Sequence, residues 1–175
     1  MGDIDDSHLT DEQIRTIIRD DYIKESDVFV LLCGKNTKHR KHIDWEIHAA
    51  MYRSELKKPL PILVVNVSSS NNGQRSCEEN EKQYIDNTFG PCVWISCRTR
   101  ADFIQFFPDM PERIIDSFET KYSNISVVNF TAGISVIKEF IKNAYSRRNS
   151  YEYNDSRVLR RHNGAKEESY VKSIY

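Results

Sequence analysis

The chain lacks the features that would place it in a membrane, outside the cell or on nucleic acid. Its 175 residues carry 25 lysines and arginines against 26 acidic residues, a formal net charge of −1. A balance of this kind does not favour general binding to nucleic acid or to membrane surfaces. No uncharged apolar run approaches the roughly 18 residues of a membrane span, and the acidic start of the sequence is unlike a secretory signal. We therefore expect a cytoplasmic protein.

Cysteine is scarce, and nothing in its spacing indicates a metal site. There are four cysteines: Cys33, Cys77, Cys92 and Cys97. No two of them form a Cys-x-x-Cys pair, and no histidine pair follows at zinc-finger spacing. A disulfide framework is not expected in a cytoplasmic chain. His42 and His48 are not spaced as metal ligands around a third group, so we predict free structural thiols and no metal.

Standard catalytic and nucleotide-binding motifs are missing as well. The sequence contains no Gly-x-Gly-x-x-Gly, no Gly-Lys-Ser/Thr and no Gly-x-Ser-x-Gly, so no standard phosphate loop or serine-nucleophile elbow is predicted. Any chemistry must therefore come from a less general arrangement of side chains.

What the sequence does contain is an alternation of apolar runs and amphipathic segments. Strands are expected at four places: residues 28–32, 62–67, 93–97 and 125–130. Helices are expected at another four: residues 10–25, 43–55, 111–122 and 135–147. The apolar run at 28–32 predicts a buried strand. The segment at 62–67 lacks polar alternation, which is typical of a strand buried on both faces of a parallel sheet. Strands alternating with helices indicate an α/β fold with a mostly parallel sheet.

The first helix has the clearest boundary signal. Thr10 and Gln13 have the spacing of a capping box. Apolar residues then recur at helical spacing and predict a buried stripe: Ile14, Ile17, Ile18 and Tyr22. Arg19 falls on the opposite, polar face of this helix.

The stretch that follows offers the best candidate for a functional site. Gly34 ends the strand at 28–32, and a basic loop at 35–42 leads into the next helix. Such a loop lies at the carboxyl end of a strand, where open α/β sheets bind ligands. The free N–H groups at the helix start could face a phosphate. A solvated surface loop without function is the alternative interpretation.

Glu46 lies about one turn into that helix, and two interpretations are open. It can be a surface glutamate that stabilises the first helical turn through the helix dipole. It can also be a carboxylate at the mouth of a cleft. There it would hold ribose hydroxyls, or stabilise positive charge that develops on a sugar ring as a glycosidic bond breaks.

These residues resemble a known family. The similarity is carried by three stretches: residues 11–15, 26–37 and 40–47. They are similar to the bacterial TIR-like domains, and in particular to the TIR-like component of the Thoeris anti-phage defence system. The most specific part is the turn from Gly34 to Thr37, followed by Trp45, Glu46 and an isoleucine. The resemblance spans roughly residues 8–163.

The resemblance implies a flavodoxin-like TIR fold, with helices on both faces of a mostly parallel sheet. It also implies an enzyme that cleaves NAD at the nicotinamide glycosidic bond and makes a cyclic ADP-ribose-type signal for a separate effector. NAD would be the substrate, and no cofactor is implied. Glu46 would be the catalytic carboxylate. Five further residues would belong to the nucleotide pocket: Gly34, Thr37, His42, Asp44 and Trp45.

The sequence departs from the family at its start. The family begins with a Phe-x-Ser-type strand and a loop that line the pocket, whereas the first helix here matches the family's second. We therefore expect an N-terminally truncated fold with an exposed sheet edge, which invites pairing with another chain. The chain would then be a truncated product, a degenerate member or a domain completed by a partner.

Two other functions remain open beside the enzyme. One is a catalytically inactive TIR-like interaction module that forms a homo-oligomer or binds a partner. The other is a flavodoxin-type nucleotide binder. We expect a flexible N-terminus at residues 1–9, a TIR-like domain at 10–146 and a polar C-terminal tail at 147–175. The arginine-rich tail has too few aliphatic residues to fold alone, but it could strap across the domain.

Overall fold

The computed structural model describes residues 5–53, 58–68, 73–118, 125–149 and 152–164. The strands are β1 (Phe29–Cys33), β2 (Ile62–Asn66) and β3 (Ser126–Asn129). The α-helices are α1 (Asp11–Ile17), α2 (Lys41–Met51), α3 (Glu79–Phe89), α4 (Arg100–Phe106), α5 (Glu112–Phe118) and α6 (Ile134–Ser146). Shorter helical turns are η1 (Ile18–Tyr22), η2 (Thr37–His39) and η3 (Phe130–Ala132). None of the helices in these ranges has the length and apolar character needed to cross a membrane.

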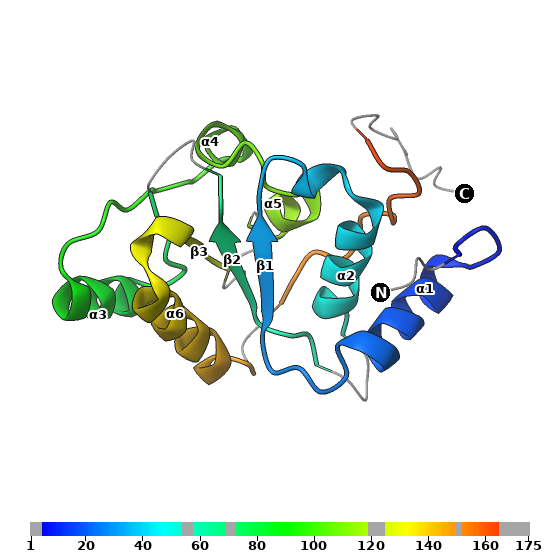
Figure 1. The fold of residues 1–175 in the computed structure, drawn as a ribbon, viewed down its shortest axis with the longest axis horizontal. Coiled ribbons are helices and arrows are strands. Elements are labelled where there is room, and N and C mark those ends of the chain that lie inside the picture. Colours follow the sequence, from blue (N-terminus) through cyan, green and yellow to red (C-terminus); the bar gives the residue numbers. More distant parts are fainter. Residues whose placement is uncertain (1–4, 54–57, 69–72, 119–124, 150–151, 165–175) are drawn as a thin grey trace.

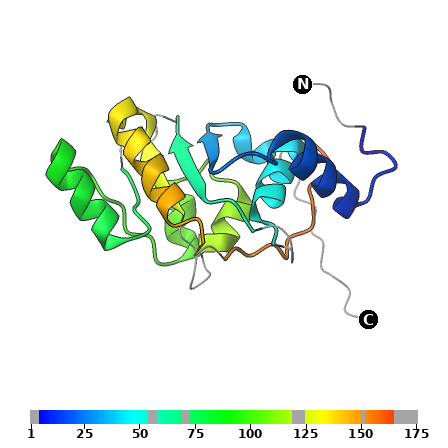
Figure 2. The ribbon, with the colours of Figure 1, turned by 90° about the horizontal axis from the view of Figure 1, so that it is seen from below.

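The three strands form one parallel sheet in the order β1-β2-β3. Its register places Leu31 beside Val64, and Val64 beside Val127. Helices cover both faces of this sheet (Figure 1; Figure 2). On one face, α3 and α6 pack against Leu63 and Val65. On the other, α1, α2, α4 and α5 enclose the larger core. The predicted α/β fold is confirmed, and the arrangement is consistent with a flavodoxin-like TIR fold.

β1 is buried on one face only, although its apolar run predicted a buried strand. Leu31 and Cys33 are buried, but Val30 is 37% exposed and Leu32 is 61% exposed. The reason is that α6 lies over β2 and β3 (Figure 1). β1 forms one edge of the sheet, and no other strand in the described ranges pairs with its outer side.

The predicted strand at 93–97 is wrong. Only Trp94 makes a single parallel bridge, to Gln74, while Arg75 makes an antiparallel bridge to Val127. The 93–97 segment therefore lies beyond β3 and is not a full strand of the sheet. The sequence predicted no helix at α3 or α4. Both have few apolar residues on a regular stripe, and only Ile85 of α3 and Phe103 of α4 are buried hydrophobic residues.

The capping box predicted for the first helix is confirmed, but the predicted buried face of this helix is only partly correct. The capping box is present, because the Gln13 N–H donates to Thr10 Oγ1 and the Thr10 N–H donates to Gln13 Oε1. At Ile18 the helix changes to the wider π spacing of η1. Tyr22 is consequently 42% exposed, while Arg19 is only 8% exposed.

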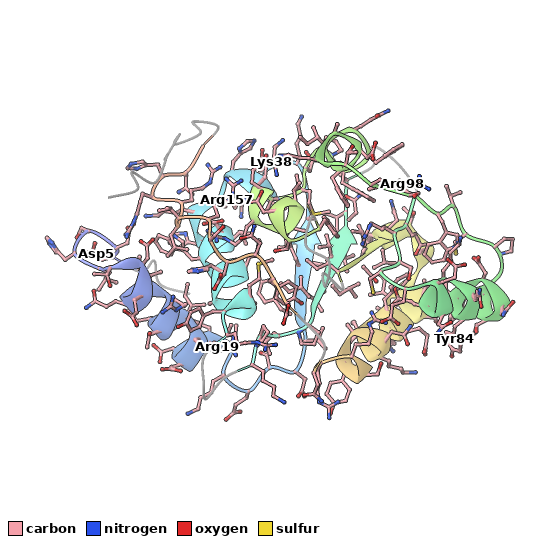
Figure 3. The ribbon with its side chains drawn as sticks, turned by 180° about the vertical axis from the view of Figure 1, so that it is seen from behind. Asp5, Arg19, Lys38, Tyr84, Arg98 and Arg157 are labelled. Atoms are coloured by element: carbon pink, nitrogen blue, oxygen red, sulfur yellow. The ribbon has the colours of Figure 1, made fainter. Side chains whose placement is uncertain are left out.

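Arg19, predicted on the polar face, instead joins α1 to the end of α2. Its guanidinium donates to the Ala49 carbonyl at 2.7 Å and to the Lys58 carbonyl. Figure 3 labels Arg19 near the end of the first helical segment. Unpaired carbonyls at a helix C-terminus are favourable partners for a cation, so this arginine closes the packing of two helices.

Residues 152–164 cross α5, α2 and α1, as the sequence allowed. Leu159 is buried in the main core. The Tyr153 hydroxyl bonds to the Leu60 carbonyl and accepts from the Ile62 N–H. Arg157 pairs with Asp116 of α5 (Figure 3). We refer to residues 152–164 as the strap.

Candidate functional site

The turn after β1 is fixed by the two residues that the motif singled out. Thr37 Oγ1 accepts from the Gly34 N–H at 2.9 Å and donates to the Leu32 carbonyl at 3.3 Å. A Cβ at position 34 would meet Val67 Cγ2 at 3.0 Å, so the small residue allows the turn to pack closely on the segment after β2. The described contacts of Gly34 and Thr37 are thus internal to the turn that leads into α2.

Glu46 is half-buried in the middle of α2, and no hydrogen bond to its carboxyl group is found among the described residues. Burial raises the pKa of Glu46, and the nearby His42, one helical turn earlier, opposes that shift. Buried polar groups normally have hydrogen-bond partners. A carboxyl group with a pKa raised by burial and without such a partner is typical of functional sites.

Trp45 and His42 form the neighbouring part of α2. Their rings meet edge to face, with centroids 4.9 Å apart. Trp45 is fully buried, and its indole N–H donates to the Arg160 carbonyl at 2.7 Å. The Lys41 ammonium lies 5.1 Å from the Trp45 ring centroid and pairs with Asp6 at 2.8 Å. Trp45 therefore holds the strap against α2, while His42 lies one helical turn before Glu46.

Asp44 is the partner of a fully buried arginine. The Arg113 guanidinium donates from Nε and Nη2 to the two Asp44 carboxylate oxygens, both at 2.9 Å. It also donates to the Arg157 and Val158 carbonyls, at 2.8 and 3.1 Å. The Arg160 N–H completes the arrangement by donating to Asp44. This group fixes α2, α5 and the strap together.

The start of α2 is occupied by the strap. The Lys41 N–H donates to Asn163 Oδ1, and the Gly164 N–H donates to the His39 carbonyl, both at 2.9 Å. Lys38 of the basic loop donates to the Pro108 carbonyl at 2.6 Å. One helix-start amide predicted to face an anion therefore has a protein partner, and the loop is partly fixed by its own contacts.

The structure thus divides the predicted site residues into three groups. Gly34 and Thr37 shape the turn, Asp44 and Trp45 hold the strap, and Glu46 follows His42 along α2. Sequence reasoning missed Arg113 as a functional support. Its signal was a charged residue directly before the apolar pair of α5, Ile114 and Ile115.

His48 gives α2 a measurable response to pH. Burial, with Arg113 and Arg15 nearby, lowers the pKa of His48 from 6.5 to about 4. The unfolded chain takes up a proton below pH 6.5, whereas the folded chain does so only near pH 4. Stability is therefore present above pH 6.5 and falls as the pH drops towards 4, by roughly 3 kcal/mol at most.

We expect His48→Leu to remove this part of the pH dependence. Urea unfolding at pH 7 and at pH 4.5 would measure it. The wild type should lose more stability between these values than the variant, since the carboxylates that also titrate there are common to both. Equal losses in the two proteins would contradict a buried, neutral His48.

The comparison with known families matches this part of the chain. The family model described as Thoeris protein ThsB, TIR-like domain, matches residues 2–72, which is less than half of the 175 residues. No curated protein and no solved structure matches the chain. The matched segment contains α1, β1, α2 and β2, and with them Glu46 and the turn from Gly34 to Thr37. Residues 2–72 therefore match the TIR-like domain family of the Thoeris anti-phage defence protein ThsB, as the resemblance predicted for that part of the chain.

Proposed function

We propose that this chain cleaves the nicotinamide glycosidic bond of NAD as part of an anti-phage response, with Glu46 as the catalytic carboxylate. The observation that carries the proposal is the half-buried Glu46 carboxyl group, which has a raised pKa and no hydrogen-bond partner among the described residues. The family match over residues 2–72 supports the defence role.

The chemistry requires a negative charge near the ribose. When the C–N bond breaks, its electron pair goes to the nicotinamide ring, which leaves neutral, and positive charge develops on the ribose ring. An ionised Glu46 would stabilise that charge in the transition state. Attack on the sugar by a group of the same molecule gives a cyclic ADP-ribose-type product, and attack by water gives ADP-ribose.

Residues that precede Glu46 on α2 support its position. Asp44 and Trp45 precede it directly, and their bonds to Arg113 and Arg160 fix the rotation of α2 about its axis. A fixed helix holds the carboxylate in one position, which is what electrostatic stabilisation of a transition state needs. His42 is the neighbour expected to shape the pocket wall.

The test is an NAD-consumption assay on the full chain with product identification by mass spectrometry. We expect nicotinamide to be released in equal amount to the NAD consumed, together with an ADP-ribose-type product. The assay should be repeated with lysate from phage-infected cells as a source of trigger. Absence of nicotinamide release in both conditions would contradict the proposal.

One observation favours a second function, that of an assembly module without catalysis. β1 is an edge strand of the sheet in the described ranges, and its uncovered face carries the exposed side chains of Val30 and Leu32. An open edge strand invites pairing. In this case the TIR-like domain at 10–146, with the tail at 147–175, would oligomerise or bind a partner. Light scattering that showed a monomer at high concentration would contradict this function.

A further inference from the structure

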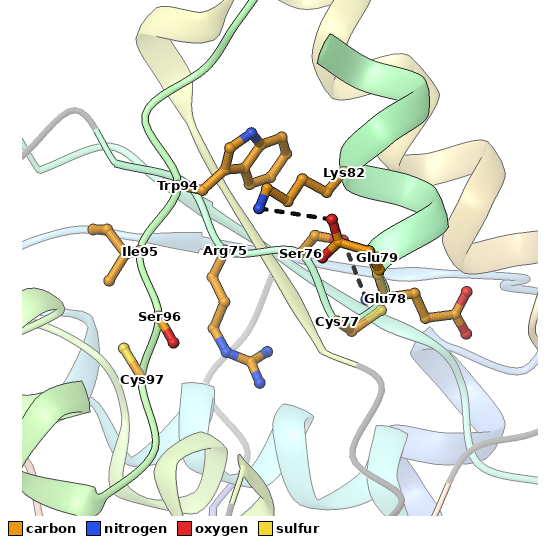
Figure 4. A pocket seen from close by; sticks show the side chains of 10 residues that line it. All are labelled: Arg75, Ser76, Cys77, Glu78, Glu79, Lys82, Trp94, Ile95, Ser96 and Cys97. Atoms are coloured by element: carbon orange, nitrogen blue, oxygen red, sulfur yellow. Dashed lines mark hydrogen bonds and ion pairs between the residues drawn. The ribbon is translucent and has the colours of Figure 1, made fainter. Parts of the chain in front are cut away.

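A cleft lies away from α2, at the β3 side of the sheet. It is a cleft of about 310 Å³ between residues 75–82, which lead into α3, and residues 94–97. The Arg75 N–H and carbonyl pair with Val127 of β3. Helix α2, in contrast, lies beside β1 at the other edge (Figure 1). Figure 4 shows the Arg75 side chain between the two walls of the cleft.

The Arg75 side chain is held rigidly but has no carboxylate partner among the described residues. Its guanidinium lies 4.6 Å from the Phe118 ring centroid and 5.4 Å from that of Phe103. It donates from Nη1 to the Ile125 carbonyl at 2.6 Å. Within the described ranges it forms no ion pair. Burial lowers the pKa of Arg75, and the charge of the nearby Glu81 opposes that shift in part. A half-buried cation without a directly paired counter-charge is costly, and its other N–H groups remain as donors for an anion.

The rim of the cleft adds a second cation near the start of a helix. Lys82 of α3 contacts Glu79 at 3.8 Å, and this pair is largely exposed and therefore weak. Glu78, the other acidic residue at the rim, pairs with Arg147 at 3.7 Å. Both glutamates thus have basic partners of their own, and neither neutralises Arg75.

Trp94 supplies a flat apolar wall. Its indole N–H donates to both carboxylate oxygens of Asp86, at 3.0 and 2.9 Å, which fixes the orientation of the ring. Figure 4 shows the Trp94 ring beside the Lys82 side chain at the upper end of the cleft. An aromatic wall and a fixed cation together suit a ligand with a planar ring and a negative charge.

The two thiols of the cleft favour binding over reaction. Burial raises the pKa of Cys77 to about 11 and also that of Cys97 to about 11. Both thiols are therefore neutral at pH 7, and the neutral thiol is not a nucleophile. They contribute polarisable walls and weak hydrogen bonds.

From these observations we propose that the cleft binds a purine mononucleotide, with its phosphate at Arg75 and its base against Trp94. The volume is at the lower end of the range of ligand pockets, which favours a mononucleotide over a dinucleotide. This site is separate from Glu46 and does not rest on the NAD chemistry. A nucleotide bound here would contact the segment that leads into α3, the first turn of α3 and residues 94–97.

Intrinsic fluorescence gives a direct test, using adenosine monophosphate as the probe on the full chain. The protein has two tryptophans, and Trp45 is fully buried. We expect saturable quenching below about 1 mM nucleotide, which corresponds to roughly 4 kcal/mol of binding. Trp94→Phe should abolish the quenching. Adenosine, which lacks the phosphate, should bind at least about tenfold more weakly.

Variants that leave the packing of Arg75 intact would test whether the nucleotide binds in this cleft. Ser96→Phe fills the cleft from an exposed position and should abolish binding, and Lys82→Ala should weaken it several-fold. Lys142→Ala, which changes an exposed lysine of α6, is the matched control and should have no effect. Titration calorimetry would measure the same affinities independently. Binding that is absent in the wild type, or unchanged in Ser96→Phe, would overturn the proposal.

Discussion

Replacing Glu46 by glutamine should reduce NAD cleavage at least about 100-fold and leave the fold intact. Glutamine has nearly the same shape but carries no charge, so it cannot stabilise positive charge on the ribose. Loss of a single electrostatic group in an active site typically costs a factor of about 100 to 1,000 in turnover. The measurement is the rate of nicotinamide release at saturating NAD, with thermal unfolding of both proteins recorded in parallel.

A matched control separates the charge of Glu46 from charge in general. Glu12→Gln removes a carboxylate from α1 whose side chain is 80% exposed and which pairs only weakly with Arg15. This variant should cleave NAD at the wild-type rate. If Glu46→Gln also kept the wild-type rate, the assignment of Glu46 would be wrong even if the protein consumed NAD.

The pH profile of the reaction gives a second view of Glu46. Burial raises the pKa of Glu46 above its ordinary value of 4.5. The ionised form is therefore present at neutral pH and is lost as the pH falls through the raised value. We expect NAD cleavage to decline on the acidic side at a pH above 4.5, with an inflection that Glu12→Gln leaves unchanged.

Local signals predicted the parts of the fold that local contacts decide. The capping box of Thr10 and Gln13 and the turn from Gly34 to Thr37 each form within four residues, and both are present. β2, whose apolar run has no polar interruption, is buried at every position. In the capping box and the turn, the residues that make the contact are neighbours in the sequence, and β2 is recognised from its own composition.

The sequence did not predict contacts between residues that are far apart along the chain. Arg19 was placed on the polar face because a period of about 3.6 residues puts it there, but the π spacing of η1 turns it towards Ala49. The apolar run at 93–97 was interpreted as a strand, yet pairing needs a neighbour, and only Trp94 finds one. Periodicity describes one element and says nothing of what lies opposite.

In the candidate site, too, the sequence predicted local features but not contacts between distant residues. Glu46 was proposed from its place on the helix after β1, and in the structure its side chain is half-buried. The positions of Asp44 and Trp45 depend on Arg113 and Arg160, which lie 69 and 115 residues further along the chain. No spacing rule connects such residues, so the strap contacts could only come from the three-dimensional structure.

Removing the Arg113 side chain should cause a large loss of stability. The Arg113 side chain is completely buried, and the Asp44 side chain is 13% exposed. Arg113→Ala leaves the Asp44 carboxylate and the Arg157 and Val158 carbonyls without their main donor. Leaving one partner of a buried ion pair uncompensated typically costs about 3–5 kcal/mol, a large part of the roughly 5–15 kcal/mol that stabilises a domain.

Urea unfolding would measure this loss, and Arg100→Ala is the control. Arg100 pairs with Asp116, but its side chain is 35% exposed, so its removal should cost no more than about 1 kcal/mol. A loss below about 1 kcal/mol for Arg113→Ala would contradict the structural role of the pair. The double variant Asp44→Asn/Arg113→Ala should lose less than the sum of the single variants, because each removes the partner of the other.

The same pair links stability to the proposed chemistry. Asp44 lies two residues before Glu46, so releasing it from Arg113 also frees the helix that carries the proposed catalytic carboxylate. Asp44→Asn keeps the shape and part of the hydrogen bonding, and should fold while cleaving NAD more slowly than wild type. A folded Asp44→Asn protein with unchanged turnover would show that Glu46 is held by the core packing of α2 alone, without the contribution of the strap.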